Sequence, residues 1–395
     1  MGMYNFDKVM DRRNSGSYKY EKLESLFGRK DLLPLWVADM DFETPDFIVD
    51  ALKKRMEHPV FGYACAPEEW WGVVRKWLGE HHGWKVKEEW LTFIPGIVKG
   101  IGMAVNVFVG QGEKVIIQPP VYHPFRLTPE GNGREVVYNP LEEVNGRYMM
   151  DFDNLEEVCD EKCRMLILCN PHNPAGILWD KETLCRLAEF CYDHHLIVIS
   201  DEIHCDIALW GKKHIPFASV SEKAAQCSVT FFAPSKTFNM AGLVCSYAVV
   251  PNAMLRNAFY SWLSANELNE PDIFAPLAAV AAFKYGEEWR RQMISYLEGN
   301  IELVEDFCRE RIPGIKPWRP DASFLVWLDC RSLRLPQEKL MDFFVNHARL
   351  ALNNGVMFGK EGEGFMRLNV GTPRAVLQKA MGQLEQAWKE FLAVL

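Results

Sequence analysis

The stretch RMLILCNPHNPAGILWDKETLCRLAEFCYDHHLIVISDEIH (Arg164–His204) decides the fold of this chain. It begins and ends with apolar runs rich in strand-forming residues, Arg164–Cys169 and Leu196–Ser200. The segment between them, Lys181–His194, has helical periodicity, and one face of that helix holds Leu184, Leu187, Ala188 and Cys191. A strand, a helix and a second strand in this order predict two parallel strands joined by a crossover helix.

The same alternation continues on both sides of this stretch. Further runs with strand composition are Lys114–Gln118, Ser228–Phe232 and Val244–Val250. Near the N-terminus, Thr44 and Pro45 form a capping and first-turn signal for another helix. We therefore expect an α/β protein with a mostly parallel sheet covered by helices.

The pattern changes from about Glu287 onward. A long helical stretch begins there, followed by the strand-like segments Ser323–Asp329 and Gly364–Val370 and by a closing helix from Pro373. We expect the chain to be organised as an N-terminal arm (1–45) that contributes to the small domain, a large domain (46–284) and a smaller α+β domain (285–395).

Composition limits the kinds of partner. The chain has 395 residues and a formal net charge of −9, which argues against a nucleic-acid or anionic membrane surface, because both favour basic patches. Its N-terminus lacks an apolar signal core, and the longest apolar stretch, around Phe274–Phe283, is about half of the roughly 20 residues that span a bilayer. We expect a cytoplasmic protein with small-molecule partners.

The eleven cysteines are scattered through the expected strands and helices. An odd number in such positions is typical of reduced core residues rather than of a disulfide framework. The sequence contains no Cys-x-x-Cys or His-x-x-x-His pair, the spacings that commonly bind a metal ion. We therefore predict no metal site.

Three unusual loops follow predicted strands, and ligands of open α/β sheets bind beyond these carboxyl ends. The loops are NPHNPAG (Asn170–Gly176), DEIH (Asp201–His204) and APSKTFNMAGL (Ala233–Leu243). They bring an amide, a carboxylate and a lysine to neighbouring strand ends. This set suits a pyridine-aldehyde cofactor: the lysine condenses with the aldehyde, the carboxylate pairs with the protonated ring nitrogen, and the amide donates to the phenolate oxygen.

Several motifs outside and within these loops carry a family resemblance. They are LPLWVADMDFETP (Leu33–Pro45), FGYA (Phe61–Ala64), QPPVYHPF (Gln118–Phe125), SKTFNMAGL (Ser235–Leu243) and MRLNVGTPR (Met366–Arg374). With them, essentially the whole chain resembles the fold-type I pyridoxal phosphate enzymes of the aspartate aminotransferase superfamily. Within that superfamily it is similar to the MalY/PatB branch of cystathionine β-lyases and related C–S lyases. The resemblance implies a seven-stranded sheet in the large domain and a smaller α+β domain.

The resemblance also assigns the residues around the cofactor ring. It makes Lys236 the lysine that holds the cofactor and, once substrate has displaced it, the base that removes the Cα proton. Asp201 becomes the partner of the ring nitrogen, and Asn173 contacts the ring hydroxyl and the substrate. His204 is expected near the same oxygen, with a purely structural histidine as the alternative. Tyr122 is expected to stack on the ring and to contact substrate, with plain core packing as the alternative.

The cofactor phosphate needs hydrogen-bond donors. A helix-start anion site is expected from the backbone amides of Gly96, Ile97 and Val98. The resemblance adds Ser235 and, from the other subunit of a homodimer, Tyr63, which could equally be a core residue. The chain departs from the superfamily at Ala233, where Ser or Thr is common, and at Val244, where Arg or Lys often binds phosphate. We hypothesise that the amides, Ser235 and Tyr63 carry more of the anchoring here.

The substrate side of the site follows from the same resemblance. Arg367 is expected to bind the substrate α-carboxylate, because its planar guanidinium suits bidentate recognition; the alternative is a surface arginine on a strand. Val37 and Ala38 are expected to line the approach of the substrate. Asp39 is expected either to do the same or only to fix the arm.

The predicted reaction is β-elimination from a sulfur amino acid such as L-cystathionine or cysteine, giving pyruvate, ammonia and a thiol or sulfide. An aminotransferase would use the same residues, and motifs do not separate the two reactions. A third hypothesis, from a different class, is a pyridoxal phosphate-bound regulatory protein that acts through protein partners. The resemblance further implies a homodimer with shared active sites.

Overall fold

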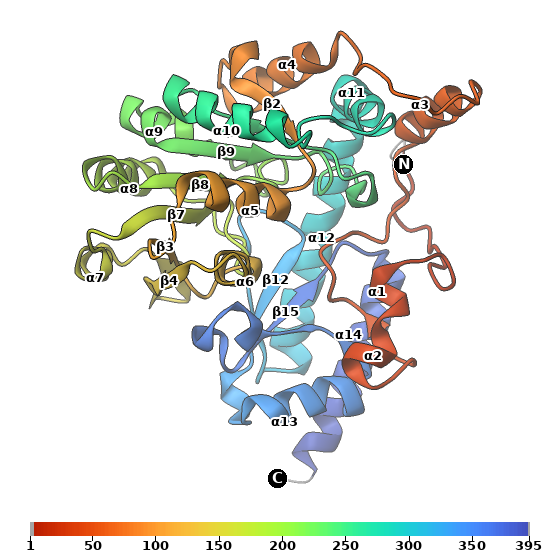
Figure 1. Ribbon diagram of the computed structural model, residues 1–395. Coiled ribbons are helices and arrows are strands. Elements are labelled where there is room, and N and C mark those ends of the chain that lie inside the picture. Colours follow the sequence, from red (N-terminus) through yellow and green to blue (C-terminus); the bar gives the residue numbers. More distant parts are fainter. Residues whose placement is uncertain (1–3, 394–395) are drawn as a thin grey trace.

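A seven-stranded sheet forms the centre of the larger part of the molecule (Figure 1). The computed structural model describes residues 4–393. In spatial order the strands are β2 (Leu91–Ile94), β10 (Ser246–Val249), β9 (Ser228–Phe232), β8 (Ile197–Asp201), β7 (Cys163–Cys169), β3 (Lys114–Ile117) and β4 (Glu135–Tyr138). Only β10 pairs antiparallel with its neighbours, so the predicted mostly parallel sheet is confirmed.

Helices cover both faces of the sheet, which explains why the central strands β7, β8 and β9 are mainly apolar, whereas the edge strand β4 is partly exposed. In β7, Met165 and Ile167 pack with α5 (Ile97–Phe108) and α10 (Ala253–Ala265). The alternate residues of the same strand pack on the opposite face, together with α8 (Lys181–Asp193). Further helices of this part are α3 (Asp46–Met56), α4 (Trp70–His82), α6 (Pro124–Gly131), α7 (Phe152–Val158), α9 (Glu222–Cys227) and α11 (Ala275–Tyr285). A small hairpin, β5 (Glu142–Val144) and β6 (Arg147–Met149), precedes α7.

The second part contains a four-stranded antiparallel sheet. Its strands, in spatial order, are β11 (Lys316–Trp318), β12 (Leu325–Asp329), β15 (Phe365–Asn369) and β14 (Asn353–Asn354). The helices around it are α12 (Glu287–Arg311), α13 (Gln337–Asp342) and α14 (Arg374–Leu392). In Figure 1, α12 runs from the larger sheet to this second one. The domain limits at residues 45 and 284 remain our proposal.

The N-terminal arm lies against the second part (Figure 1). It holds the short helices α1 (Tyr18–Glu21) and α2 (Leu23–Phe27), and its strand β1 (Leu33–Pro34) pairs in parallel with β13 (Leu350–Ala351). After β1 the chain returns to the large sheet through α3. On the way, residues 36–42 hydrogen-bond both to β15 and to the loop after β9.

Two local expectations are wrong. Helix α3 begins at Asp46 with Pro45 as its N-cap, and Thr44 does not cap it, because its hydroxyl donates to the Asn239 carbonyl at 2.8 Å. The strand expected from Val244 begins only at Ser246, because Val244 has a left-handed backbone with φ of 51°. At Thr44 a tertiary contact replaces the local cap, and at Val244 the turn formed by residues 241–243 delays the strand.

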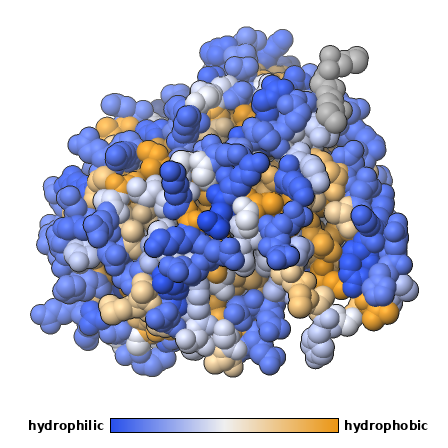
Figure 2. All heavy atoms as spheres, turned by 90° about the horizontal axis from the view of Figure 1, so that it is seen from above, coloured by the Kyte–Doolittle hydropathy of each residue, from blue (hydrophilic) through white to orange (hydrophobic). Residues whose placement is uncertain are grey.

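Most of the face seen from above is hydrophilic, with apolar side chains gathered in places between the polar ones (Figure 2). Among residues 4–393, no helix is both long enough and apolar enough to cross a membrane.

Candidate active site

The carboxyl ends of β7, β8 and β9 meet at one cavity of about 210 Å³. Because parallel strands end at the same edge of a sheet, the loops that follow them place Asn173, Asp201 and Lys236 on its wall. Other predicted site residues on the same wall are Ala38, Gly96, Ile97, Val98, Tyr122, His204 and Ser235. Three predicted residues do not line it: Val37, Tyr63 and Arg367.

Asp201 is the last residue of β8 and is buried. Its Oδ1 accepts a hydrogen bond of 3.1 Å from the Ile203 amide, and among the described residues no basic nitrogen lies within ion-pairing distance. Burial raises the pKa of its carboxyl to about 7. Such a carboxylate is completed by a cationic partner, and a protonated pyridine nitrogen has the required charge and geometry. The donor set therefore fits the predicted cofactor.

Lys236 lies in the loop after β9 and reaches across the cavity to donate to the Ala38 carbonyl. Burial lowers the pKa of its amine to about 8; Arg367 adds to this effect, while Asp39 and Asp201 oppose it. Compared with an exposed lysine, a larger fraction is neutral near pH 7. A neutral amine can attack an aldehyde or accept a proton, as the predicted roles of Lys236 require.

Arg367 is a buried cation without a carboxylate partner among the described residues. Its guanidinium donates to Asn173 Oδ1 at 2.8 Å, to Asn353 Oδ1 at 2.6 Å and to the Trp36 carbonyl at 3.1 Å. Its Nε has no hydrogen-bond partner, and burial lowers its pKa to about 10. The alternative of a surface arginine is wrong. The open donor and uncompensated charge suit a substrate carboxylate.

Asn173 is held in place by its own loop. Its amide lies 3.3 Å from Cys169 Sγ, and the loop closes through a hydrogen bond of 2.7 Å from the Gly176 amide to the His172 carbonyl. Gly176 has φ of 66°, and a Cβ there would lie 2.7 Å from the Ala322 carbonyl oxygen. Only glycine fits this turn, which aims Asn173 at the cavity.

At the end of the cavity where we expect the phosphate, one of the three predicted backbone donors is already hydrogen-bonded. Gly96 caps α5, but its amide already donates to the Ile94 carbonyl at 2.9 Å. The free donors of this turn are therefore the amides of Ile97 and Val98 at the helix start. Ser235 is buried on the same wall, and the exposed Val244 lies where a basic residue would add charge.

The two aromatic residues of the prediction lie on the cavity wall, and their roles remain predictions. Burial raises the pKa of Tyr122, so its hydroxyl stays protonated. His204 is fully buried, which lowers its pKa well below the usual range, and its Nδ1 lies 3.0 Å from the Ser323 hydroxyl. It is therefore neutral and held by Ser323, whether or not it also contacts the cofactor.

Val37 and Tyr63 lie away from the cavity. Val37 is partly buried against a cluster that includes Leu23 and Val345, and its carbonyl accepts from Asn369 at 2.6 Å. Tyr63 is completely exposed, with a relative exposure of 110%. The alternative of a core tyrosine is wrong, and the single chain leaves this side chain free to reach another molecule.

Several wall residues were missed by the sequence analysis: Cys169, Pro171, Ile203, Ala241, Cys245 and Ser246. Cys169 ends β7 as Asp201 ends β8, and Ile203 follows Asp201 by two positions. Strand-end position could have predicted both. Cys245 and Ser246 could not be predicted in this way, because they begin a strand that runs in the opposite direction.

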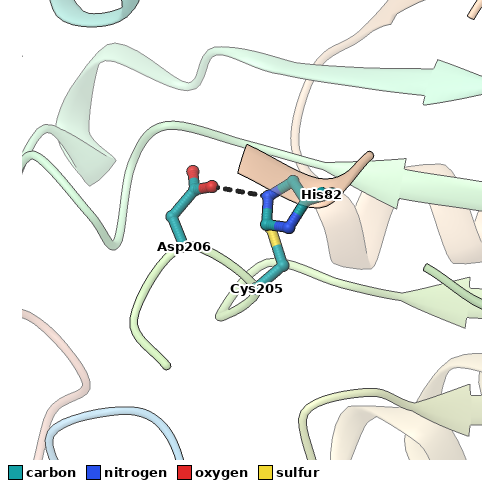
Figure 3. Close-up of side chains that lie close together, drawn as sticks. All are labelled: His82, Cys205 and Asp206. Atoms are coloured by element: carbon teal, nitrogen blue, oxygen red, sulfur yellow. Dashed lines mark hydrogen bonds and ion pairs between the residues drawn. The ribbon is translucent and has the colours of Figure 1, made fainter. Parts of the chain in front are cut away.

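His82 of α4 meets the loop that follows Asp201 (Figure 3). His82 Nε2 lies 2.8 Å from Asp206 Oδ1, which also accepts from Trp77 Nε1 at 2.9 Å. Cys205 lies beside them, and burial raises the pKa of its thiol well above the usual range. The Asp206 carboxylate already accepts hydrogen bonds from its neighbours, so we assign no metal ion to the cluster. We infer that these hydrogen bonds hold the loop after β8 in place.

Comparison with known proteins identifies the class. The family Aminotransferase class I and II matches residues 30–384, so the chain belongs to this family of pyridoxal phosphate-dependent enzymes, and the predicted fold type I and cofactor are confirmed. The chain is 43% identical to Cystathionine beta-lyase PatB of Bacillus subtilis, over 97% of this chain and 99% of that one. Protein MalY of Escherichia coli is 32% identical, with coverage of 98% and 99%. Cystalysin from Treponema denticola, whose crystal structure contains pyridoxal 5'-phosphate, superimposes with a TM-score of 0.95 at 32% identity, covering 98% and 99%. The resemblance to the MalY/PatB branch is thereby confirmed.

Proposed function

We propose that this chain is a pyridoxal phosphate-dependent C–S β-lyase that acts on sulfur amino acids of the cystathionine or cysteine type. The observation that carries the proposal is the 43% identity to a cystathionine β-lyase over nearly the full length of both chains. The site supports it with Lys236 and the buried Asp201 on the cavity wall, and with the buried Arg367, which hydrogen-bonds to Asn173 of that wall.

The residues of the cavity fit the cofactor as follows. Lys236 would hold its aldehyde, Asp201 its ring nitrogen and Asn173 its ring hydroxyl. The free amides of Ile97 and Val98, with Ser235, would hold its phosphate. When bound, pyridoxal phosphate supplies an electron sink for the pair left when a Cα–H bond breaks.

The chain's own groups then perform the remaining tasks. Arg367 binds the substrate carboxylate and so orients the Cα–H bond toward Lys236. The freed Lys236 amine takes the Cα proton, and the negative charge of Asp201 would favour a protonated ring nitrogen. The Cβ–S bond breaks with both electrons going to sulfur, and the sulfur takes the proton from Lys236 and leaves as a thiol or hydrogen sulfide. The released aminoacrylate is hydrolysed to pyruvate and ammonia.

Transamination is the competing function, because the matching family carries the name of aminotransferases. It needs the same removal of the Cα proton by Lys236, followed by transfer of the amine to a 2-keto acid. A regulatory role through protein partners is compatible with either reaction.

We further propose that two copies form a homodimer in which Tyr63 of one copy reaches the phosphate end of the other cavity. Tyr63 is fully exposed next to Phe61 and Val60, which are 58% and 60% exposed. Adjacent apolar side chains with such exposure are typical of a protein contact. A cytoplasmic location is supported by the cysteines, all of which are free.

The test is release of pyruvate and thiol from L-cystathionine by purified, cofactor-loaded protein without added keto acid, compared with Lys236→Ala. Sustained, lysine-dependent release of both products is expected. A single conversion of the cofactor to its pyridoxamine form, reversed by a keto acid and without pyruvate, would replace the lyase by an aminotransferase.

A further inference from the structure

The segment Trp36–Phe42 of the N-terminal arm passes between the two candidate catalytic cations. Its backbone carbonyls are acceptors for both of them: Arg367 donates to Trp36 at 3.1 Å, and Lys236 donates to Ala38. One short stretch of backbone thus contacts the groups assigned to the substrate carboxylate and to the Cα proton.

Two asparagines hold this segment from opposite sides. Asn369, two residues after Arg367 in β15, donates to the Val37 carbonyl at 2.6 Å and to the Asp39 carbonyl at 2.7 Å. Asn239, three residues after Lys236, holds the other end. It donates to the carbonyls of Met40 at 3.0 Å and Phe42 at 2.6 Å and accepts from the Met40 amide at 3.0 Å. Each asparagine therefore links the arm to the element that carries one of the two cations.

The charged side chains of the segment are also fixed. Arg12 pairs with Asp39 at 2.7 Å, and Lys19, which has no exposed surface, pairs with Asp41 at 2.9 Å. Asp39 therefore holds its negative charge close to Lys236. The charged or titratable groups that face the Lys236 amine are Asp39 from the arm, Asp201 and His204 from the loop after β8, and Arg367 from β15.

We propose that Asn239 and Asn369 are positioning residues that act through the Trp36–Phe42 segment, holding the Ala38 carbonyl and Asp39 where they stabilise the ammonium form of Lys236. A carbonyl accepts a stronger hydrogen bond from an ammonium group than from a neutral amine, and the Asp39 charge acts in the same direction. Given the proposed function, on which this meaning rests, the segment helps the Lys236 amine to accept the proton from Cα and to hold it until it passes to the leaving sulfur.

The test uses the full chain loaded with pyridoxamine 5'-phosphate, which has no aldehyde and leaves Lys236 free. Acetylation of Lys236 by acetic anhydride is followed by mass spectrometry over a range of pH, and the midpoint of the reactive form is measured. In Asn239→Ala and Asn369→Ala the ammonium form loses stabilisation. The midpoint is therefore expected to fall by about one pH unit, the size expected for a weakened hydrogen bond to a charged group.

The control is Asn139→Ala. Asn139 is a fully buried asparagine that donates to the Asp151 carbonyl at 2.8 Å and does not touch the arm. Its variant is expected to lose a comparable part of the unfolding free energy without moving the midpoint. Midpoints in both arm variants that equal the control's would overturn the proposal. If Asn239→Ala does not fold, Asn369→Ala decides alone. No turnover is measured, so this result is independent of whether the enzyme eliminates or transaminates.

Discussion

The Arg367 guanidinium donates a hydrogen bond of 2.8 Å to Asn173 Oδ1 across a separation of 194 residues. Asn173 lines the cavity, whereas Arg367 does not, so this bond joins the residue proposed to bind the substrate carboxylate to the cavity wall. A substrate carboxylate that binds Arg367 therefore also changes the environment of Asn173. Four predictions follow from this and other contacts of the site.

Replacing Arg367 by alanine should raise KM for L-cystathionine about 10- to 100-fold, because charge-assisted hydrogen bonds to the carboxylate are lost. Arg331→Ala is the matched control, since Arg331 is an exposed arginine that pairs with Glu143 and Asp329 away from the cavity. Steady-state kinetics of both variants check the assignment. Equal KM values for the two would remove Arg367 from the substrate site.

Asp201 should make the unfolding free energy of the cofactor-free protein depend on pH. Burial raises its pKa from 3.8 to about 7, so the folded state favours the protonated acid. The stability that this proton contributes is present below about pH 4 and is lost as pH rises to about 7. Each pKa unit corresponds to about 1.4 kcal/mol, so wild type should lose a few kcal/mol over this window relative to Asp201→Asn.

Urea denaturation of the cofactor-free proteins at about pH 4.5 and pH 7.5 measures this difference. The pH dependence should shrink when pyridoxal phosphate is bound, because a cationic ring nitrogen stabilises the carboxylate. Parallel stability curves for wild type and Asp201→Asn would show that Asp201 titrates normally.

Gly176→Ala should destabilise the loop that aims Asn173, because the new Cβ clashes with Pro320 and with the Ala322 carbonyl oxygen. Gly211→Ala separates this clash from backbone strain, since Gly211 has a similar φ of 69° but no atom within 4 Å of the new Cβ. We expect a cost of about 1–3 kcal/mol for strain alone at Gly211 and a larger one at Gly176. Chemical denaturation checks both, and equal costs would contradict the close contact.

Cofactor retention should depend on Ser235 and Tyr63, because Ala233 and Val244 offer the phosphate no side-chain donor. Ser235→Ala and Tyr63→Phe should each weaken pyridoxal phosphate binding about tenfold. Val244→Lys should strengthen it, since Val244 lies on the cavity wall and is 38% exposed. Equilibrium dialysis measures all three, and unchanged affinity in the Ser235→Ala/Tyr63→Phe double variant would refute the anchoring hypothesis.

The sequence by itself determined the sheet and the placement of Asn173, Asp201 and Lys236. Alternating strands and helices impose a parallel arrangement, and parallel strands end at one edge, so the polar residues that follow them must meet there. The family motifs added Arg367 and Tyr122 by resemblance. The placement of Asn173, Asp201 and Lys236 uses only local pattern and chain direction, and the structure brings all three to one cavity wall; the roles of Arg367 and Tyr122 stay predictions.

The tertiary structure alone decided which distant groups meet. Several hydrogen bonds join segments that are far apart in the sequence and share no periodic pattern. They are the bonds of Asn239 and Asn369 to the arm, of Lys236 to Ala38 and of His82 to Asp206. The local sequence pattern likewise did not predict that the Gly96 amide donates to the Ile94 carbonyl or that Val244 has a left-handed backbone. The physical reason is that burial and hydrogen-bond partners depend on packing between elements, and the pKa values of Lys236 and Asp201 depend on both.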